Sequence, residues 1–325
     1  MITHIKFENF RGFRSLQLDG LKRVNLIVGH NNSGKTSFLE GLLILCEPSR
    51  VDSLPGRLRS SEGDPETRYF RWLLRDKSQD VAGCIEGTIE GIPGKISIER
   101  TAERQQRAGA ARKLVTTPEA PWHQVHGGQS VSIRRQGDAT QRCCIISTQP
   151  RPVKDLVALL GKAQRKRDGE DTLTKLLNKV DPRISRIRID PDPHGNQIIV
   201  DVGLSELLPL AQVGQGVQRL VAILAEIIGD APDVVLIDEV EIGLHHSVHE
   251  LVWAGLAETA KRLNVQIFAT THSFECVEAA HSAFVKRDDY DFGVIQLFRV
   301  DTGLQGRVLD RKHIEAAMDG SIDLR

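Results

Sequence analysis

Residues 24 to 37 read Val-Asn-Leu-Ile-Val-Gly-His-Asn-Asn-Ser-Gly-Lys-Thr-Ser, and they are the most informative stretch of the sequence. An apolar segment enters a turn bounded by Gly29 and Gly34, and a second apolar segment follows the turn. This order predicts a buried strand, a tight turn and a helix. Residues 29 to 36 match G-x-x-x-x-G-K-[ST] at every defined position, which is the pattern of a phosphate-binding loop, or P-loop.

The residues of this loop suit the chemistry of phosphate binding. Converging backbone N–H groups hold adjacent phosphates best, and glycines permit the tight turn that aims those groups inward. Lys35 can reach the terminal phosphates, the Thr36 hydroxyl can bind Mg²⁺, and a helix from Ser37 to Leu45 points its positive dipole end at the anion. The expected nucleotide-binding residues are Gly29, His30, Asn31, Asn32, Ser33, Gly34, Lys35, Thr36 and Ser37. The alternative is a glycine-rich turn that binds nothing.

The composition is that of an ordinary soluble protein, with 325 residues, 40% hydrophobic and 26% charged. The formal net charge is +0, so any contact with nucleic acid or membrane needs a local patch. The five cysteines form no C-x-x-C pair, which favours reduced thiols. No apolar run approaches the ~20 residues that span a bilayer, and the N-terminus lacks the apolar core of a signal peptide. These observations predict a cytoplasmic protein without membrane contact.

The N-terminal part of the chain predicts strands around one buried helix. Alternating patterns indicate strands over residues 2 to 9 and 15 to 18, ahead of the strand that enters the P-loop. Residues 38 to 46 are too apolar for a surface helix, so that helix should be buried. A short helix is expected at residues 69 to 74, within a region of loops, and a hairpin at residues 81 to 101.

The middle of the chain predicts a strand at residues 143 to 147, helices over 153 to 180 with a break near Gly169, and a hairpin formed by 185 to 190 and 197 to 202. Residues 102 to 141 are polar and rich in glycine and proline. Basic side chains gather there and at its leading edge, namely Arg100, Arg104, Arg107, Arg112, Lys113, Arg134 and Arg135. They could contact DNA through its phosphates, although a solvated, mobile loop explains them more simply.

Two further apolar runs supply the second half of the site. Residues 233 to 239 read as a buried strand that ends in Asp238 and Glu239, and ligands bind at the carboxyl ends of such strands. Asp238 is expected to hold Mg²⁺, and Glu239 to polarise the water that attacks the γ-phosphate. The next buried strand, 265 to 271, delivers His272, which could contact the γ-phosphate and hold that water. The expected catalytic residues are therefore Lys35, Glu239 and His272.

A second glycine-rich helix start lies at residues 212 to 220, ahead of an apolar helix that reaches Ile228. Gly214 and Gly216 make it another candidate anion-binding N-terminus. Because the P-loop already serves one nucleotide, this surface could bind a nucleotide held by a second copy of the chain. A glycine-rich helix cap without a ligand explains the same residues equally well.

The order of these motifs, with Glu241-Ile242-Gly243-Leu244-His245 between Glu239 and His272, resembles the ABC-type ATPases. The opening Ile5-Lys6-Phe7-Glu8-Asn9-Phe10-Arg11-Gly12-Phe13 resembles the RecF, SMC and OLD-nuclease branch rather than the transporter branch. The combination of these motifs is most similar to that of stand-alone AAA-type ATPases related to the OLD ATPase domain. Specific motifs cover residues 1 to 45 and 201 to 285, and the middle matches loosely.

The resemblance implies an α/β fold of ABC-ATPase type. Its core would be a mainly parallel sheet with helices on both faces, accompanied by an antiparallel N-terminal lobe and an inserted subdomain. One bilobed domain would span residues 1 to 325, with 1 to 80 and 201 to 325 as the nucleotide-binding core. Residues 81 to 200 would form inserted strands and a helical arm.

The resemblance also assigns site residues and the nucleotide, ATP. Two protomers would enclose two nucleotides, with Gly214 and Gly216 acting across the interface and His272 as the switch histidine. Glu241 and Gly243 would belong to the loop that links the two sites. Arg11 would approach the phosphates. The Mg²⁺ ligands would be Thr36, Asp238 and Gln149, the last as the glutamine between the lobes.

Two departures from the family pattern shape the functional hypotheses. Gln212-Val213 stands where the signature serine is usual, and the chain ends at Arg325, too soon after His272 for a nuclease domain.

The leading hypothesis is a Mg²⁺-dependent ATPase whose ATP-bound homodimer is a switch for DNA-related or anti-phage defence work, with a separate effector such as a nuclease. The alternative is an ATP-binding sensor or scaffold with negligible hydrolysis. A transporter subunit is a third hypothesis, which the N-terminal motif disfavours.

Overall fold

The computed structural model describes residues 1–49, 72–75, 81–102, 122–126, 129–137, 140–149, 151–191, 195–320 and 324. Most of the stretch 102 to 121, with its arginines, lies outside these residues. The helix expected at 69 to 74 lies partly outside them too. In its described part, Leu74 forms an isolated antiparallel bridge with Phe10 and no α-helix is present, so that part of the prediction is wrong.

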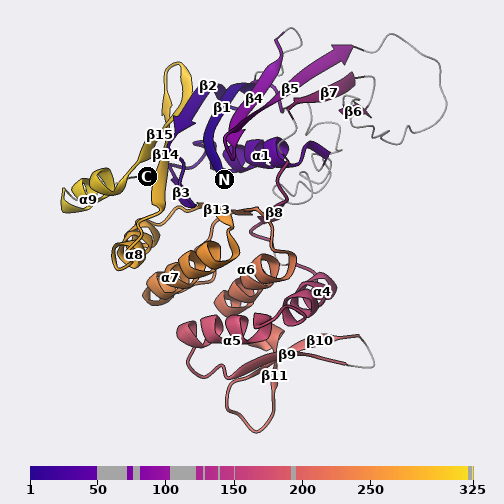
Figure 1. The fold of residues 1–325 in the computed structure, drawn as a ribbon, viewed down its shortest axis with the longest axis vertical. Helices are drawn as coiled ribbons and strands as arrows, with labels where there is room; N and C mark the ends of the chain where they lie inside the picture. The colour runs from indigo at the N-terminus through magenta and orange to yellow at the C-terminus, as the bar shows by residue number, and fades with distance from the viewer. Residues whose placement is uncertain are drawn as a thin grey trace, which may run out of the picture.

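A mainly parallel sheet forms the centre of the described structure (Figure 1). Its strand order is β15-β14-β3-β13-β12-β8, and only the edge strand β15 runs antiparallel to its neighbour. The strands are β3 (Val24–Val28), β8 (Cys143–Ile146), β12 (Val234–Ile237), β13 (Gln266–Thr270), β14 (Phe292–Val300) and β15 (Gly303–Leu309). Three strands were expected to lead into the P-loop, into Asp238 and into His272. These strands, β3, β12 and β13, therefore lie next to one another in one sheet.

Both faces of this sheet are covered, which explains why its strands are continuous apolar runs. In β12, Val234 and Leu236 join the cluster around helix α1 (Lys35–Cys46), whereas Val235 and Ile237 join the cluster of helices on the other face. Those helices include α6 (Gln215–Asp230), α7 (His246–Leu263) and α8 (Phe274–Val285). Helices on both faces of a mainly parallel sheet were predicted, and this is confirmed.

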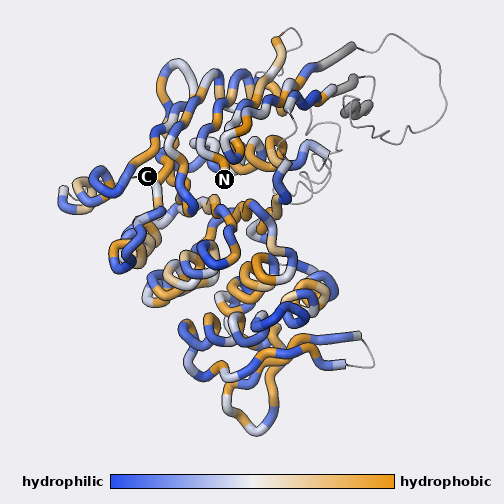
Figure 2. The backbone as a smooth tube through the Cα atoms, viewed as in Figure 1, coloured by the Kyte–Doolittle hydropathy of each residue, from blue (hydrophilic) through white to orange (hydrophobic). Residues whose placement is uncertain are grey.

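An antiparallel sheet packs over α1 on the side away from α6 and α7 (Figure 1). Its order is β2-β1-β4-β5-β7-β6. The strands are β1 (Ile2–Phe10), β2 (Phe13–Asp19), β4 (Gly83–Ile89), β5 (Ile92–Ala102), β6 (Trp122–His126) and β7 (Gln129–Gln136). A Cβ added at Gly41 of α1 would lie 2.5 Å from the Phe7 ring, so helix and sheet are in close contact. Figure 2 shows the hydrophobic character of α1. The burial predicted for this helix is confirmed.

The middle of the chain adds helices α4 (Val153–Gln164) and α5 (Gly169–Val180), which pack beside α6. A small antiparallel sheet of β9 (Arg186–Asp190), β10 (Gln197–Asp201) and β11 (Leu208–Pro209) adjoins them. A 3-10 helix, Leu210–Gln212, then leads to α6, and α9 (Arg311–Asp319) follows the last strand.

The helix break at Gly169 and the hairpin formed by 185 to 190 and 197 to 202 are confirmed, whereas the domain division at residues 81 and 200 stays a prediction. Among the described residues, no helix has the length and apolar character required to cross a bilayer.

Candidate functional site

The expected functional residues meet at one edge of the parallel sheet. Strands β3, β13, β12 and β8 run in the same direction, so their carboxyl ends lie together. Backbone hydrogen bonds join the segments that leave them. Thr271 N donates to Ile27 O at 3.1 Å, and Asp238 N donates to Ile146 O at 2.9 Å. The P-loop, the two carboxylates and His272 therefore leave adjacent strands.

The P-loop has a conformation that its glycines make accessible. Gly29 has φ 149° and Gly34 has φ 94°, both in the region that glycine adopts most readily. A Cβ at Gly29 would lie 2.3 Å from the Leu297 carbonyl oxygen, and one at Gly34 would lie 2.9 Å from the Phe13 ring. A side chain at either position would therefore clash with the strands that support the loop.

The loop and the start of α1 provide donors for a phosphate chain. Phe38 N donates to Gly34 O at 2.8 Å as the first helical bond, so the preceding N–H groups of α1 have no intrahelical partner. The Lys35 ammonium donates to Gly29 O at 2.6 Å and to His30 O at 3.0 Å. The buried Ser33 hydroxyl has no hydrogen-bond partner among the described residues. These features fit a nucleoside triphosphate held by its phosphates.

The charge on Lys35 depends on its surroundings. Burial of the side chain lowers the lysine pKa to about 8, although the carboxylates of Glu239, Asp238 and Glu241 oppose this effect. The ammonium is therefore largely protonated at neutral pH and loses its proton near pH 8 in the free protein. Because the protonated form is the one that attracts phosphate, nucleotide capture should depend on pH in that range.

We expect kcat/KM for ATP hydrolysis to fall as the pH rises through about 8, because the free protein then loses the Lys35 charge. A pH profile of kcat/KM measured between roughly pH 6.5 and 9.5 tests this expectation. The melting temperature, measured at each pH, is the control for unfolding. A profile that stays flat across this range while the protein remains folded would show that the Lys35 ammonium does not titrate there.

The two carboxylates at the end of β12 share one anchor. The Thr270 hydroxyl donates to Asp238 Oδ1 at 2.8 Å and accepts the Glu239 N–H at 2.8 Å. Glu239 has φ 49°, a rare conformation for a glutamate, which places it at the start of a sharp turn. Burial raises the pKa of Asp238, while the Thr270 hydrogen bond and the Arg219 charge lower it. Asp238 is thus a buried carboxylate next to Lys35, as expected for a metal ligand.

His272 lies beside the expected catalytic carboxylate. Its Nε2 atom is 3.4 Å from Glu239 Oε1, and its backbone N–H donates to Glu241 Oε1 at 2.7 Å. The sequence predicted His272 near the γ-phosphate, and the structure places it next to Glu239. The catalytic role of each residue stays a prediction.

Arg219 is a residue that the sequence analysis did not assign to the site. It lies on α6, and its guanidinium donates to Ser147 O, to Asp238 O at 2.5 Å and to Glu239 O at 3.3 Å. Burial lowers the pKa of this arginine, and the three nearby carboxylates oppose the shift. The sequence feature that could have indicated this role is a basic residue within an otherwise apolar helix. Its contacts tie the start of α6 to the ends of β8 and β12.

The glycine-rich start of α6 is exposed next to this edge. A Cβ at Gly216 would lie 2.4 Å from Gly243 O, which shows that α6 packs tightly on the turn after β12. Gly214 is the N-cap of α6, and a Cβ there would meet nothing within 4 Å. The helix N-terminus is therefore open, and its contact with a nucleotide of a second copy stays a prediction.

The remaining predicted site residues lie in different surroundings. Arg11 is buried, with its Nε atom 2.8 Å from Glu40 Oε2 of α1, so this guanidinium is held at the interface of α1 and the antiparallel sheet. Gln149 is exposed after β8 and lines a pocket of about 560 Å³ together with Gln215 and Arg219. A phosphate role for Arg11 and a metal role for Gln149 stay predictions.

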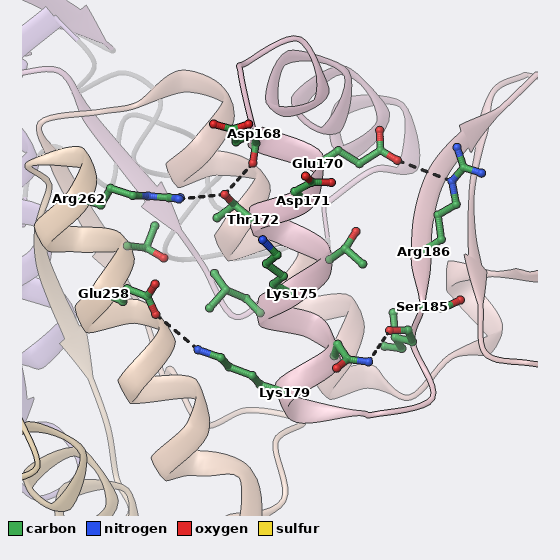
Figure 3. A pocket seen from close by; sticks show the side chains of 15 residues that line it. Asp168, Glu170, Asp171, Thr172, Lys175, Lys179, Ser185, Arg186, Glu258 and Arg262 are labelled. Atoms are coloured by element: carbon green, nitrogen blue, oxygen red, sulfur yellow. Dashed lines mark hydrogen bonds and ion pairs between the residues drawn. The ribbon is translucent and has the colours of Figure 1, made fainter.

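A larger pocket of about 950 Å³ lies on elements outside the nucleotide edge, between α5, α7 and the start of β9 (Figure 3). Several of its charged side chains form ion pairs or hydrogen bonds within the pocket. Lys179 Nζ is 3.4 Å from Glu258 Oε2, Arg186 Nε is 3.8 Å from Glu170 Oε1, and Arg262 donates to Thr172 at 3.0 Å. This mutual pairing indicates a charged surface groove and does not identify a ligand.

Two family models match the chain. A model described as an AAA ATPase domain matches residues 1–103, and an AAA domain model whose description refers to AbiEii toxin and type IV toxin–antitoxin systems matches residues 151–278. An ATP/GTP phosphatase of Helicobacter pylori is 23% identical over 334 residues, covering 89% of this chain and 90% of that protein. RecF of Oenococcus oeni is 25% identical over 103 residues, which is 24% of that protein.

Solved SMC head structures share the fold. An SMC head bound to the C-terminal winged-helix domain of ScpA has a TM-score of 0.59 at 13% identity and covers 98% of this chain and 99% of its own. The family models, the RecF relatives and this fold together support an ABC-type ATPase of the RecF and SMC branch. A second SMC head with an extended coiled coil, bound to a ScpA domain from Pyrococcus furiosus, has a TM-score of 0.58 at 10% identity. These likenesses confirm the predicted fold class, whereas the predicted ATPase activity is supported by the AAA family models and the ATP/GTP phosphatase relative.

Proposed function

We propose that this ATPase binds ATP and Mg²⁺ between two copies of the chain and acts as a nucleotide-driven switch for DNA-related or anti-phage defence work through a separate effector. The observation that carries the proposal is the convergence of Lys35, Asp238, Glu239 and His272 at one edge of the sheet. Lys35 follows β3, Asp238 and Glu239 follow β12, and His272 follows β13. The His272 imidazole lies 3.4 Å from the Glu239 carboxylate.

The proposed roles follow from the charges at this edge. Lys35 and the N-terminus of α1 hold the phosphates, and the Glu239 carboxylate accepts a proton from the attacking water. His272 keeps that water in line. Thr36, Asp238 and Gln149 would hold Mg²⁺, which neutralises charge on the phosphate oxygens. Buried Asp238, with a hydrogen bond from Thr270, has the oxygen ligand that such an ion requires.

The open start of α6 supports the two-copy arrangement. Gly214 leaves the backbone N–H groups of this helix accessible to an anion, and no side chain caps them. A P-loop on one copy and the start of α6 on the other would enclose the same nucleotide. ATP would then join the two copies, and hydrolysis would release them.

The proposals of a separate effector and of a defence role rest on the similarity of this chain to known proteins. The family description that mentions toxin–antitoxin systems supports defence, and the ScpA-bound SMC heads support a protein partner. Kinship with the OLD-nuclease ATPase domain would make that partner a nuclease. Described basic residues that could approach DNA include exposed Arg134 on β7.

A second candidate function is an ATP-binding sensor or scaffold with negligible hydrolysis. Gln212-Val213 before Gly214 favours it, because the hydroxyl of the usual signature serine is missing there and backbone N–H groups alone would contact the phosphate. The two candidates share ATP binding and differ in turnover.

The mass of the Glu239→Gln protein in solution tests the switch. This variant should keep ATP while blocking attack by water, so ATP and Mg²⁺ should shift it from monomer to dimer. Adding Gly214→Glu should abolish the shift, because a carboxylate at the open helix start repels phosphate. A mass that stays that of a monomer with ATP bound would contradict the two-copy site.

A further inference from the structure

The turn after β12 carries a third carboxylate, Glu241, which binds the backbone of a candidate site residue. Glu241 Oε1 accepts the backbone N–H of His272 at 2.7 Å. Its other oxygen, Oε2, is buried and has no hydrogen-bond partner among the described residues. A buried carboxylate oxygen without a partner lowers stability, so stability alone is a poor reason for a glutamate here.

The turn itself is firmly held. Ile242 N donates to Glu239 O at 3.2 Å, and Leu244 N donates to Glu241 O at 2.9 Å. Gly243 has φ 74° and packs against Gly216 at the start of α6. The Glu241 carboxylate therefore projects from a defined backbone and provides a fixed point for the loop that begins at His272.

One turn thus reaches the same histidine in two ways. Glu239 lies 3.4 Å from the imidazole, and Glu241 binds the histidine backbone. A hydrogen bond to an ionised carboxylate is stronger than one between neutral groups, so it restricts the position of the loop. Removing it would leave the imidazole attached to the same strand but free to shift relative to Glu239.

We infer that Glu241 is a positioning residue for ATP hydrolysis: its carboxylate binds the backbone of His272 and keeps the imidazole beside Glu239. The inference rests on the proposed catalytic roles of Glu239 and His272. Glu241 acts through His272 and need not touch the nucleotide. It therefore affects turnover more than nucleotide binding.

Glu241→Ala should lower kcat roughly 10- to 100-fold, because small displacements of a catalytic group cost this much. The KM for ATP should change less than about 3-fold, since the P-loop is untouched. Glu241→Gln keeps an oxygen that accepts the His272 N–H and should recover most of the lost turnover. In the His272→Ala background, Glu241→Ala should cause no further loss.

Steady-state kinetics of the four proteins in this cycle, with melting temperatures, test the inference. Glu258→Ala, which removes an exposed carboxylate paired with Lys179, is the matched control and should behave as wild type. Additive losses in the double variant would overturn the inference, as would unchanged kcat in Glu241→Ala. If Glu241→Ala fails to fold, Glu241→Gln together with His272→Ala completes the cycle, and turnover of Glu241→Gln far below wild type overturns the inference. Wild-type turnover in His272→Ala would refute the proposed role of His272 itself and, with it, this inference.

Discussion

Lys35→Ala should lower kcat/KM for ATP hydrolysis roughly 100- to 1,000-fold, the usual cost of removing one donor that stabilises transition-state charge. The ammonium lies in the P-loop, where it donates to Gly29 O at 2.6 Å and to His30 O at 3.0 Å. It is buried among carboxylates, and the water-poor surroundings strengthen its attraction for phosphate. Steady-state ATP hydrolysis and nucleotide binding by calorimetry measure the loss.

Lys175→Ala is the matched control, because Lys175 is an exposed lysine on α5, outside the nucleotide edge. It should leave hydrolysis unchanged. Melting temperatures of both variants separate a loss of charge from a loss of fold. Hydrolysis by Lys35→Ala at the wild-type rate, in a folded protein, would exclude the P-loop lysine from the mechanism.

Glu239→Gln should lower kcat roughly 100- to 10,000-fold, because an amide cannot accept the proton of the attacking water. Binding of ATP should change little, since the substitution leaves Lys35 and the start of α1, the proposed phosphate contacts, unaltered. The amide retains the size of the carboxylate and can still lie beside His272, so the turn after β12 should keep its shape. Single-turnover hydrolysis, measured with binding in the same samples, separates the chemical step from nucleotide affinity.

This variant also separates the two candidate functions. A switch driven by hydrolysis predicts the large fall in turnover, whereas a sensor with negligible hydrolysis predicts almost none. Glu258→Gln is the control for a neutralised carboxylate at an exposed site and should hydrolyse ATP as wild type does. Turnover that is measurable in wild type and unchanged in Glu239→Gln would require another base.

Several features of this ATPase could be predicted from sequence because they are local. The P-loop is set by the two glycines and by the lysine next to them, and their positive φ values and close contacts agree with that pattern. The buried strands that end at Ile237 and Thr270 are apolar runs, since both faces of a central strand must be covered. The helix break at Gly169 and the burial of α1 could likewise be predicted from the local sequence pattern.

Other features depend on residues far apart in the chain. Nothing in the local pattern indicates that Arg219 donates to backbone oxygens after β8 and β12, or that Glu241 binds His272. Arg11, predicted near phosphate, is buried and paired with Glu40 of α1, a contact that the local pattern does not indicate. Each contact joins residues that are distant in the sequence and that only packing brings together.

The motifs, their order and the parallel strands that deliver them can be predicted from sequence, because turn chemistry and apolar runs are local properties. How these elements are joined depends on the three-dimensional fold. It placed β3 between β14 and β13, gathered the carboxyl ends at one edge and set Glu239 and Glu241 around His272. The physical reason is that strand order and side-chain pairing arise from long-range packing, which residue spacing along the chain does not encode.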